Sequence, residues 1–374
     1  MTKVCIVTSF HNALDIRIFY KQARTLARTG YQVILIAQHA TNETRDGVTI
    51  KALPIPSNII SRLLFTTWHV FFKALREKAD VYHFHDDELL LIGFLLKLIT
   101  RSKVIYDVHE DYSQTILEKS SCPFILRRLW SSTFNLAEKQ ISRIFDHIVT
   151  ATDHIANKFN GGAVTAITNY PLVEMIKPQN NTISKNPSLI YAGQLTEIRG
   201  VSEIVQAMAF IDSSERVRLS LYGNYNPRSL RYRVCKLMGF EKVDYCGWIN
   251  QEQIWLKMAQ SFAGVICIHP VGNHICSMPN KLFEYMAAGI PVIASNFPLW
   301  KEIIEGNKCG VTVDPLKPKE IARAIDYLIR NPLKALKMGE NARKAVIEKY
   351  NWQKESEKLL AIYDSWFNTP KYTH

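Results

Sequence analysis

The feature of this sequence that most constrains its fold is an alternation of short apolar runs with segments of helical spacing. In the first half, β-rich runs predict strands at residues 3–8, 32–37, 48–53, 81–85, 103–108, 147–151 and 164–168. Between the first two runs, residues 16–29 carry apolar side chains at helical spacing, and Gly30 follows as a C-cap. Strand, helix and strand repeated in this way predict a parallel sheet covered by helices on both faces.

The alternation stops at residues 171–187, a polar stretch with three prolines that is predicted to be an interdomain linker. It then restarts, with strands expected at 188–192, 217–222, 243–246, 263–268 and 291–294 and helices near 201–211, 228–238, 251–260, 279–288 and 317–330. The pattern predicts an α/β protein of two doubly wound, Rossmann-like domains, residues 1–172 and 186–345, facing a cleft. Residues 346–374 are expected to form a helix that packs back on the first domain, and ligands are expected at the carboxyl ends of the strands.

Composition narrows the class of protein. The net charge of +12 is spread along the chain, which favours anionic partners or simply serves solubility. No recognised RNA- or DNA-binding motif is present, so no nucleic-acid partner is expected. The seven cysteines are scattered, and no signal peptide or membrane span is recognised, so we expect free thiols and a cytoplasmic protein. The absence of G-x-G-x-x-G after the first strand and of a Walker A motif argues against a nicotinamide dehydrogenase and a P-loop enzyme.

The most informative stretch is SMPNKLFEYMAAGIPVIAS at residues 277–295. Pro279 suits the first position of a helix that continues to Gly289. Backbone amides in the first turn and the helix dipole favour an anion there. Asn280 and Glu284 share one face of the helix, and a carboxylate just behind a phosphate site is well placed for a ribose diol. The alternative is an ordinary amphipathic helix with a surface glutamate.

Several segments resemble, in order, the donor site of family 4 retaining glycosyltransferases. They are the stretch above, YAGQLTEIRG at 191–200, LYGN at 221–224 and CGWI at 246–249. The resemblance runs from SFHNALDIRIF near the N-terminus through YDVHED to the final helix. It implies a GT-B fold and a retaining, metal-independent hexosyltransferase without a cofactor. The donor would be a nucleotide-diphosphate sugar, with UDP preferred to GDP as the carrier.

The resemblance also implies roles for individual residues. Glu284 would bind the ribose hydroxyls, and Arg199 and Lys281 would stabilise charge on the leaving diphosphate. A cation at Arg199 opposes the dipole of the helix that follows it, which a bound anion would offset. Further donor contacts are expected from the amides of Leu282 and Phe283, from Trp248 beside the base, and from Gly193, Gln194, Gly223, Asn224 and Asn280. Gln194 stands where the family often has an arginine.

One departure from the family pattern concerns the transferred sugar. The family has two glutamates separated by seven residues, but Cys276 occupies the first position. A thiol cannot accept hydrogen bonds as a carboxylate does. Either His274 or Ser277 takes over this role, or the sugar is recognised differently.

The first strand ends in SFHNALDIRIF, which lacks the family's Gly-Gly loop. Asp15 is predicted to cap the following helix. Arg17 could pair with Asp15 or face the donor phosphates. These alternatives stay open.

Two later strand ends carry histidines. His83 and His85 share a face of their strand and, with Asp86, Asp87 and Glu88, could suggest a metal site. We expect no metal and interpret the segment as a strand end that lines the cleft. His109 follows the strand of YDVHEDY and resembles the family's active-site histidine, with Asp107 orienting its ring and Glu110 as a secondary candidate for the acceptor hydroxyl. The alternative is a histidine that only caps the strand end.

The acceptor side is less constrained. Residues 59–72 (IISRLLFTTWHVFF) and 124–130 (FILRRLW) could form core helices or dock on an anionic bilayer, and a core helix is favoured for 59–72. The expected acceptor is a glycan or a lipid-linked glycan in bacterial surface polysaccharide or glycolipid synthesis, with peripheral contact at the inner face of the membrane. Alternative functions are a sugar-nucleotide epimerase of the same fold and a non-catalytic nucleotide-sugar-binding partner subunit, which the cysteine at 276 would suit.

Overall fold

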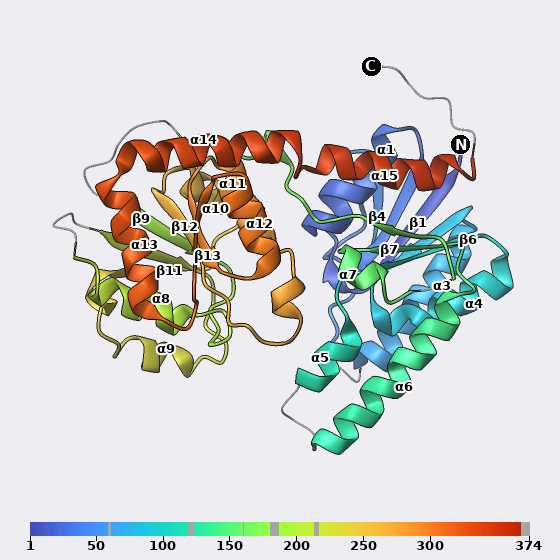
Figure 1. The fold of residues 1–374 in the computed structure, drawn as a ribbon. Helices are drawn as coiled ribbons and strands as arrows, with labels where there is room; N and C mark the ends of the chain where they lie inside the picture. The colour runs from blue at the N-terminus through green and yellow to red at the C-terminus, as the bar shows by residue number, and fades with distance from the viewer. Residues whose placement is uncertain (59–60, 119–122, 160, 180–186, 213–216, 368–374) are drawn as a thin grey trace. The chain divides into compact units, whose positions relative to one another are not determined.

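The computed structural model describes residues 1–58, 61–118, 123–159, 161–179, 187–212 and 217–367. Its contacts divide the chain into two compact units. Unit 1 comprises Met1–Asn169 with Gln353–His374, and unit 2 comprises Tyr170–Trp352. Both are α/β units built on mainly parallel sheets, so the predicted fold class is confirmed (Figure 1).

Unit 1 contains a sheet of eight strands in the order β3-β4-β2-β1-β5-β6-β7-β8, in which only the β3–β4 pair is antiparallel. The strands are β1 (Lys3–Asn12), β2 (Gln32–Gln38), β3 (Glu43–Arg45), β4 (Val48–Leu53), β5 (Val81–Phe84), β6 (Lys103–Val108), β7 (His147–Thr150) and β8 (Val164–Ala166). Continuous apolar runs such as VILIA in β2 arise because both faces of the sheet are covered.

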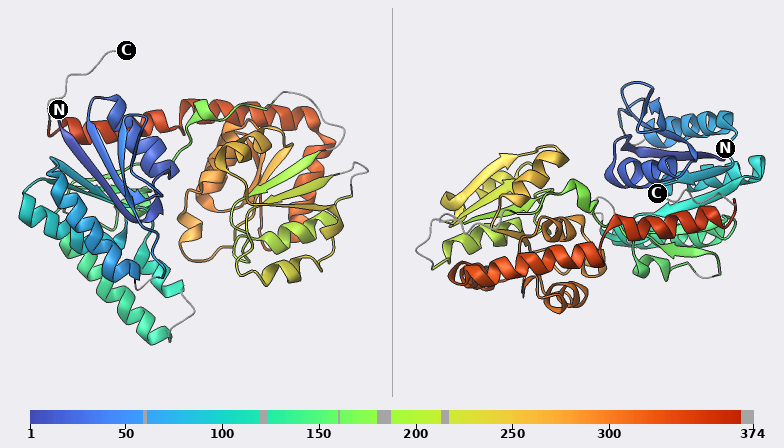
Figure 2. Two further views of the ribbon diagram at one scale, coloured as in Figure 1. Left: turned by 180° about the vertical axis from the view of Figure 1, so that it is seen from behind. Right: turned by 90° about the horizontal axis from the view of Figure 1, so that it is seen from above.

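The helices of unit 1 are η1 (Ile16–Ala23), α1 (Arg24–Arg28), η2 (Arg62–Thr66), α3 (Thr67–Glu77), η3 (Asp87–Leu89), α4 (Leu90–Thr100), α5 (Tyr112–Glu118), α6 (Phe124–Ser142), α7 (Asp153–Ala156) and α15 (Trp352–Asp364). Helices α3, α4 and α7 pack on the face of the sheet that carries Cys5 and Val7. Helices η1 and α15 cover the opposite face, where Tyr363 Oη lies 2.9 Å from His83 Nδ1. Figure 2 shows these layers from two further sides.

Unit 2 contains a parallel sheet of six strands in the order β11-β10-β9-β12-β13-β14. The strands are β9 (Ser188–Ala192), β10 (Arg218–Tyr222), β11 (Val243–Gly247), β12 (Ala263–Ile266), β13 (Val292–Ser295) and β14 (Gly310–Val313). The helices are η4 (Val173–Met175), α8 (Val201–Ala209), α9 (Leu230–Val234), η5 (Phe240–Lys242), α10 (Gln251–Ala259), η6 (Gly272–Cys276), α11 (Asn280–Ala287), α12 (Pro298–Gly306), α13 (Pro318–Arg330) and α14 (Pro332–Glu348). Helices α8, α9 and α13 share one core with the sheet. Helix α11 lies on the other face, so close that a Cβ at Gly264 would come within 2.3 Å of the Tyr285 ring.

The structure adds to the sequence prediction at several points. The short edge strand β3 is fully exposed and polar, so it carries no apolar signal, and β14 and α12 were also not predicted. The predicted linker contains residues 180–186, which lie outside the described residues. Its earlier part belongs to unit 2, where the Arg343 guanidinium donates to the carbonyl of Ile176.

The states of the cysteines and the lengths of the helices can be compared with the predicted free thiols and the expected lack of a membrane span. All six cysteines in the described ranges are free thiols, three buried and three exposed, and Cys122 lies outside those ranges. Among the described helices, none is long and apolar enough to cross a bilayer.

An ion pair inside unit 1 allows a direct test of the packing. Arg17 Nη2 donates to Asp107 Oδ1 over 2.8 Å, and both side chains are almost fully buried. Arg17→Met would leave a buried carboxylate without its cation, so the free energy of unfolding should fall by about 3–5 kcal/mol in urea titrations. The matched control is Arg218→Met, which removes an exposed Arg–Asp pair and should cost at most about 1 kcal/mol. Equal losses in the two variants would contradict this account.

Candidate functional site

Two cations of unit 2 converge on Gly193, at the carboxyl end of β9. A Cβ at this position would lie 2.5 Å from Lys281 Nζ and 3.6 Å from Arg199 Nη1. Lys281 is the second residue of α11, and its Nζ donates to Tyr191 Oη over 3.2 Å. Burial first, and the charge of Arg199 second, lower the pKa of Lys281 to about 7. Two cations beside the start of a helix make this a setting in which a bound anion would be stabilised.

Arg199 is held by the geometry of the next residue. Gly200 is the N-cap of α8 and adopts a φ of +68°. A Cβ there would lie 1.8 Å from the carbonyl oxygen of Cys267, so no other residue fits without a backbone shift. The resulting tight turn sets the course of the backbone at Arg199, just before α8.

Glu284 lies one turn into α11 and is half-buried. Its Oε1 accepts hydrogen bonds from Gln251 Nε2 over 2.8 Å and from Trp255 Nε1 over 3.1 Å, both on α10. These two partners were not predicted, because they are 33 and 29 residues away in the chain. The Glu284 carboxylate therefore sits in a fixed hydrogen-bonding environment rather than on an open surface.

The remaining predicted donor residues occupy two kinds of environment. Gln194, Asn224, Trp248 and Asn280 are exposed, and Trp248 has 70% of its surface accessible. In contrast, Gly223, Leu282 and Phe283 are buried. The Leu282 amide donates to the Pro279 carbonyl over 3.1 Å, so in this structure it closes the first turn of α11.

The loop before α11 holds the position where the family has its first glutamate. Cys276 is exposed at the end of η6. Ser277 Oγ donates to the carbonyl of His274 over 2.8 Å, and the Ser277 carbonyl accepts from Trp300 Nε1 over 2.7 Å. These bonds fix the loop that presents Cys276 beside the start of α11.

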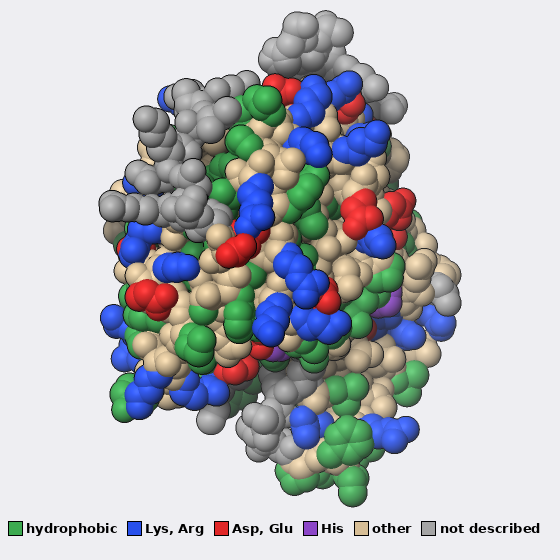
Figure 3. All heavy atoms as spheres, turned by 60° about the vertical axis from the view of Figure 1, so that its left-hand side comes forward, with side chains coloured by type: hydrophobic (Ala, Val, Ile, Leu, Met, Phe, Trp, Pro, Cys, Tyr) green, Lys and Arg blue, Asp and Glu red, His purple; other side chains and the backbone are tan. Residues whose placement is uncertain are grey.

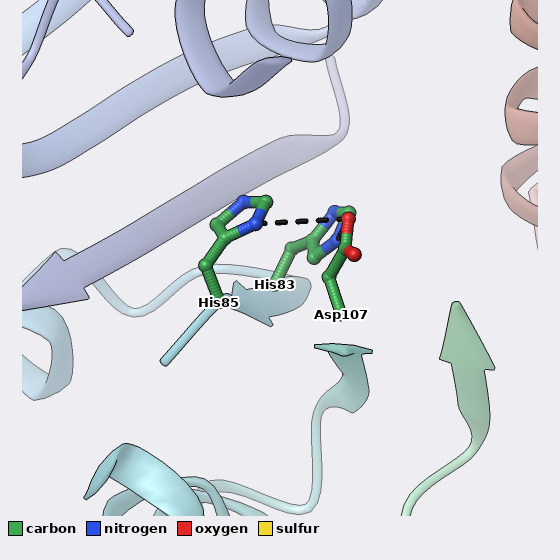
Figure 4. Close-up of side chains that lie close together, drawn as sticks. All are labelled: His83, His85 and Asp107. Carbon is green, nitrogen blue, oxygen red and sulfur yellow. Dashed lines mark ion pairs between the residues drawn. The ribbon is translucent and has the colours of Figure 1, made fainter. Parts of the chain in front are cut away.

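In unit 1, Asp107 is the centre of a buried polar cluster at the end of β6. His83, His85 and Asp107 each offer an atom within 4.8 Å of the others (Figure 4). These are residue types that hold metal ions, but Arg17 already donates to Oδ1 of Asp107, and Gln22 donates to Oδ2 over 2.5 Å. The guanidinium thus supplies the positive charge that a metal would bring, and it holds the pKa of the buried carboxyl well below its usual range against the effect of burial.

Neither interpretation of Arg17 that the sequence left open is correct. Its guanidinium is buried, pairs with Asp107 and donates to the carbonyl of Ile167 over 2.8 Å. Asp15 does cap η1, since its Oδ1 accepts from the amides of Arg17 and Ile18. Arg17 therefore has a structural role in the interior of unit 1.

His109 lies at the partly accessible edge of this cluster. Its Nε2 is 3.0 Å from His85 Nδ1 and 3.7 Å from Asp107 Oδ1, so its hydrogen-bond partner is His85. Burial is the main cause that lowers the pKa of His109 to about 4, and burial also lowers that of His85. Both rings are neutral at pH 7. Glu110, next in the chain, is exposed.

A second histidine at this edge was missed in the sequence. His11 Nδ1 lies 3.0 Å from Asp86 Oδ1, and its ring centroid is 5.2 Å from that of His109. Asp86 Oδ2 also accepts from the amide and hydroxyl of Ser9 and from the Thr8 hydroxyl. Burial lowers the pKa of His11, but the hydrogen bond and charge of Asp86 outweigh it and raise the pKa overall. Only the clustering of polar residues in SFHN and HDDE could have signalled this pair.

Comparison with known proteins matches both units to families of glycosyltransferases. Residues 17–164 match the family Glycosyltransferase Family 4, and residues 173–345 match the family Glycosyl transferases group 1. The MMP alpha-(1->4)-mannosyltransferase of Mycolicibacterium hassiacum is 22% identical over 339 residues, which cover 83% of this chain and 81% of that protein.

Two solved structures share the fold along almost the whole chain. Sucrose-phosphate synthase from Thermosynechococcus elongatus superposes with a TM-score of 0.79 at 18% identity, covering 98% of this chain and 100% of that one. Anabaena HepE in complex with UDP-glucose superposes with a TM-score of 0.73 at 14% identity and the same coverage. Fold and family matches together define a glycosyltransferase built from two α/β domains. The chain belongs to the GT-B glycosyltransferases, with its first unit of the family 4 type and its second of the group 1 type.

The His11–Asp86 pair predicts a specific titration. Asp86→Asn removes the charge that raises the pKa of His11 but leaves the ring buried, so the pKa of His11 should fall below that of an unperturbed imidazole. Histidine ring signals in an NMR titration would measure it. Asp87→Asn is the control, because the hydrogen bond and ion pair of His11 are made with Asp86, and that variant should titrate as the wild type does. A His11 pKa that does not change in Asp86→Asn would show that the pair is not formed.

Proposed function

We propose that this glycosyltransferase moves a sugar, with retention, from a nucleotide-diphosphate sugar to a glycan or lipid-linked acceptor. The observation that carries the proposal is the convergence of Lys281 and Arg199 at Gly193, with Glu284 one turn further along α11. The two cations would hold the diphosphate, and Glu284 would accept hydrogen bonds from the ribose hydroxyls. Such an arrangement fits a diphosphate joined to a ribose better than a lone phosphate.

The cations would also provide the electrostatic part of catalysis. As the bond between the sugar and the diphosphate breaks, negative charge grows on the leaving group, and fixed cations stabilise it without the aid of a metal. Lys281 has a lowered pKa because it is buried beside Arg199, so a dianionic ligand would stabilise its protonated form. Since Gln194 stands where the family often has an arginine, Lys281 would supply the second positive charge. The leaving phosphate would itself accept the proton of the acceptor hydroxyl.

UDP is our preferred carrier. Anabaena HepE, which shares the fold, is in complex with UDP-glucose. Because one relative is a mannosyltransferase, we expect the transferred sugar to be a hexose. With Cys276 in place of the family's first glutamate, we expect the sugar to be recognised differently from the family pattern.

The acceptor would bind to unit 1, where His109 and the neighbouring His11 lie at the partly accessible strand edge. A lipid-linked acceptor is supported by exposed apolar side chains on η2 and on the neighbouring helices α3, α4 and α6 of one face of the sheet. They are Leu63, Leu64, Phe65, Trp68 and Phe72 on η2 and α3, Leu91, Leu98 and Ile99 on α4, and Phe124, Ile125, Leu126, Leu129 and Trp130 on α6. Residues 61–72 are therefore only half buried, which corrects the preference for a core helix; Ile59 and Ile60 lie outside the described residues.

The charge pattern fits contact with an anionic surface. Arg128 is exposed among the apolar residues of α6, where Lys and Arg side chains add electrostatic attraction to anionic lipids. Figure 3 shows hydrophobic side chains together with Lys and Arg at the lowest part of the visible face. Elsewhere on that face, Lys and Arg are interspersed with Asp and Glu. We propose peripheral binding to the inner face of a membrane through this apolar helix surface.

Nucleotide binding tests the donor site. Thermal unfolding with UDP, GDP, ADP, CMP and dTDP should show stabilisation by one diphosphate, about 2.7 kcal/mol at a hundred times its dissociation constant. Glu284→Ala should abolish most of this stabilisation, because the ribose loses its carboxylate partner. Lys281→Met should do the same through the diphosphate. The control is Glu305→Ala, an exposed glutamate on α12. Unchanged nucleotide affinity in Glu284→Ala would contradict the assignment of Glu284 to the donor site.

Membrane binding is tested by cosedimentation with vesicles of phosphatidylcholine and phosphatidylglycerol. The double variant Ile125→Gln and Leu129→Gln should bind about tenfold more weakly, because two exposed apolar side chains can no longer enter the bilayer interface. Leu333→Gln, an exposed leucine of unit 2, is the matched control and should bind as the wild type does. A double variant that binds equally well would rule out α6 as the docking surface.

A further inference from the structure

Two side chains of α10 hold the carboxylate of Glu284 by one oxygen. Gln251 and Trp255 are four residues apart, so they lie on the same face of that helix. Their Nε2 and Nε1 atoms donate to Glu284 Oε1 over 2.8 and 3.1 Å. Trp255 is 4% exposed, and its indole N–H needs an acceptor in that environment. The contact is therefore part of how α10 packs on α11.

The two hydrogen bonds also restrict the orientation of the Glu284 carboxylate. A glutamate on a helix has three side-chain torsions, and ordering them costs free energy when a ligand binds. Two donors on one oxygen fix the carboxylate plane before any ligand arrives. An ionised carboxylate offers about four lone-pair directions, so hydroxyl donors of a ligand can still be accepted in a set orientation. Both donors are neutral, so they do not cancel the negative charge of Glu284.

We propose that Gln251 and Trp255 are positioning residues that orient Glu284 toward the hydroxyls of the donor ribose. The inference rests on the proposed function, because it assumes that Glu284 contacts the ribose. It extends that function to a second helix, which takes part in donor selection without touching the donor. The first turn of α10 is itself fixed, since the Asn250 side chain accepts from the amide of Gln253 over 2.9 Å.

The test compares UDP with 2′,3′-dideoxy-UDP, which lacks both ribose hydroxyls, by isothermal titration calorimetry. The wild type should bind UDP at least about tenfold more tightly than the dideoxy nucleotide, as expected for hydrogen bonds to a charged group. Trp255→Phe keeps an aromatic ring without the N–H, and Gln251→Met keeps the length without the donor. Each should weaken UDP binding about five- to tenfold and leave dideoxy-UDP binding unchanged. Gln253→Met, an exposed glutamine on the same helix, is the control and should keep the full preference.

The outcomes distinguish a positioning role of Gln251 and Trp255 from the proposed nucleotide-binding function itself. If both variants keep the wild-type preference for UDP, or lose affinity for both nucleotides equally, the positioning role is overturned and the contact is only structural. Should Trp255→Phe fail to fold, as judged by circular dichroism, Gln251→Met decides. If the wild type binds UDP without any preference over the dideoxy form, the ribose role of Glu284 fails, and this inference fails with it. A wild type that binds no nucleotide diphosphate overturns the proposed function itself; one that prefers GDP is tested with GDP and its dideoxy form.

Discussion

The buried carboxylate of Asp107 is the interaction on which the interior of unit 1 depends. An ion without a partner would be very costly at this depth, and the Arg17 guanidinium neutralises it from η1. The same guanidinium donates to the Ile167 carbonyl, so one side chain joins η1, β6 and the segment after β8. Gln22 adds a second donor from η1. The Arg17–Asp107 pair therefore helps to hold η1 on the sheet, beside the histidines at the strand ends.

The electrostatics of unit 2 differ from those of unit 1, because two positively charged side chains lie close together there. Lys281 arrives from the start of α11 and Arg199 from the turn before α8, and they meet at a glycine that leaves space for both. Positive charges at helix starts oppose the helix dipoles. Burial first, and the charge of Arg199 second, lower the pKa of Lys281. A parallel sheet gathers its loops at the carboxyl ends of its strands, so this repulsion is concentrated where an anionic ligand can relieve it.

The sequence predicted those parts of the molecule that local patterns determine. Apolar runs located the long strands, since a strand buried on both faces carries mainly apolar residues. The segment from Pro279 to Ser295 marked α11 and the strand after it because proline, helical spacing and glycine are local signals. Partners across the fold were not predictable in this way. Arg17 and Asp107 are 90 residues apart in the chain, and Trp255 and Glu284 are 29 apart. No regular spacing in the sequence predicts contacts at such separations. The exposed side of α3 was misjudged because aromatic residues predict burial regardless of which face they occupy.

The histidine edge of unit 1 shows how neighbouring groups of one type can be held in different states. His11 and His109 have ring centroids 5.2 Å apart, yet their pKa values are shifted in opposite directions. For His109, burial outweighs the attraction of Asp107, which Arg17 already neutralises. For His11, the hydrogen bond and charge of Asp86 act on the ring directly and outweigh burial. At one strand edge, the pKa shifts therefore favour the neutral form of His109 and the protonated form of His11. The difference therefore arises from burial together with the carboxylate that each ring faces.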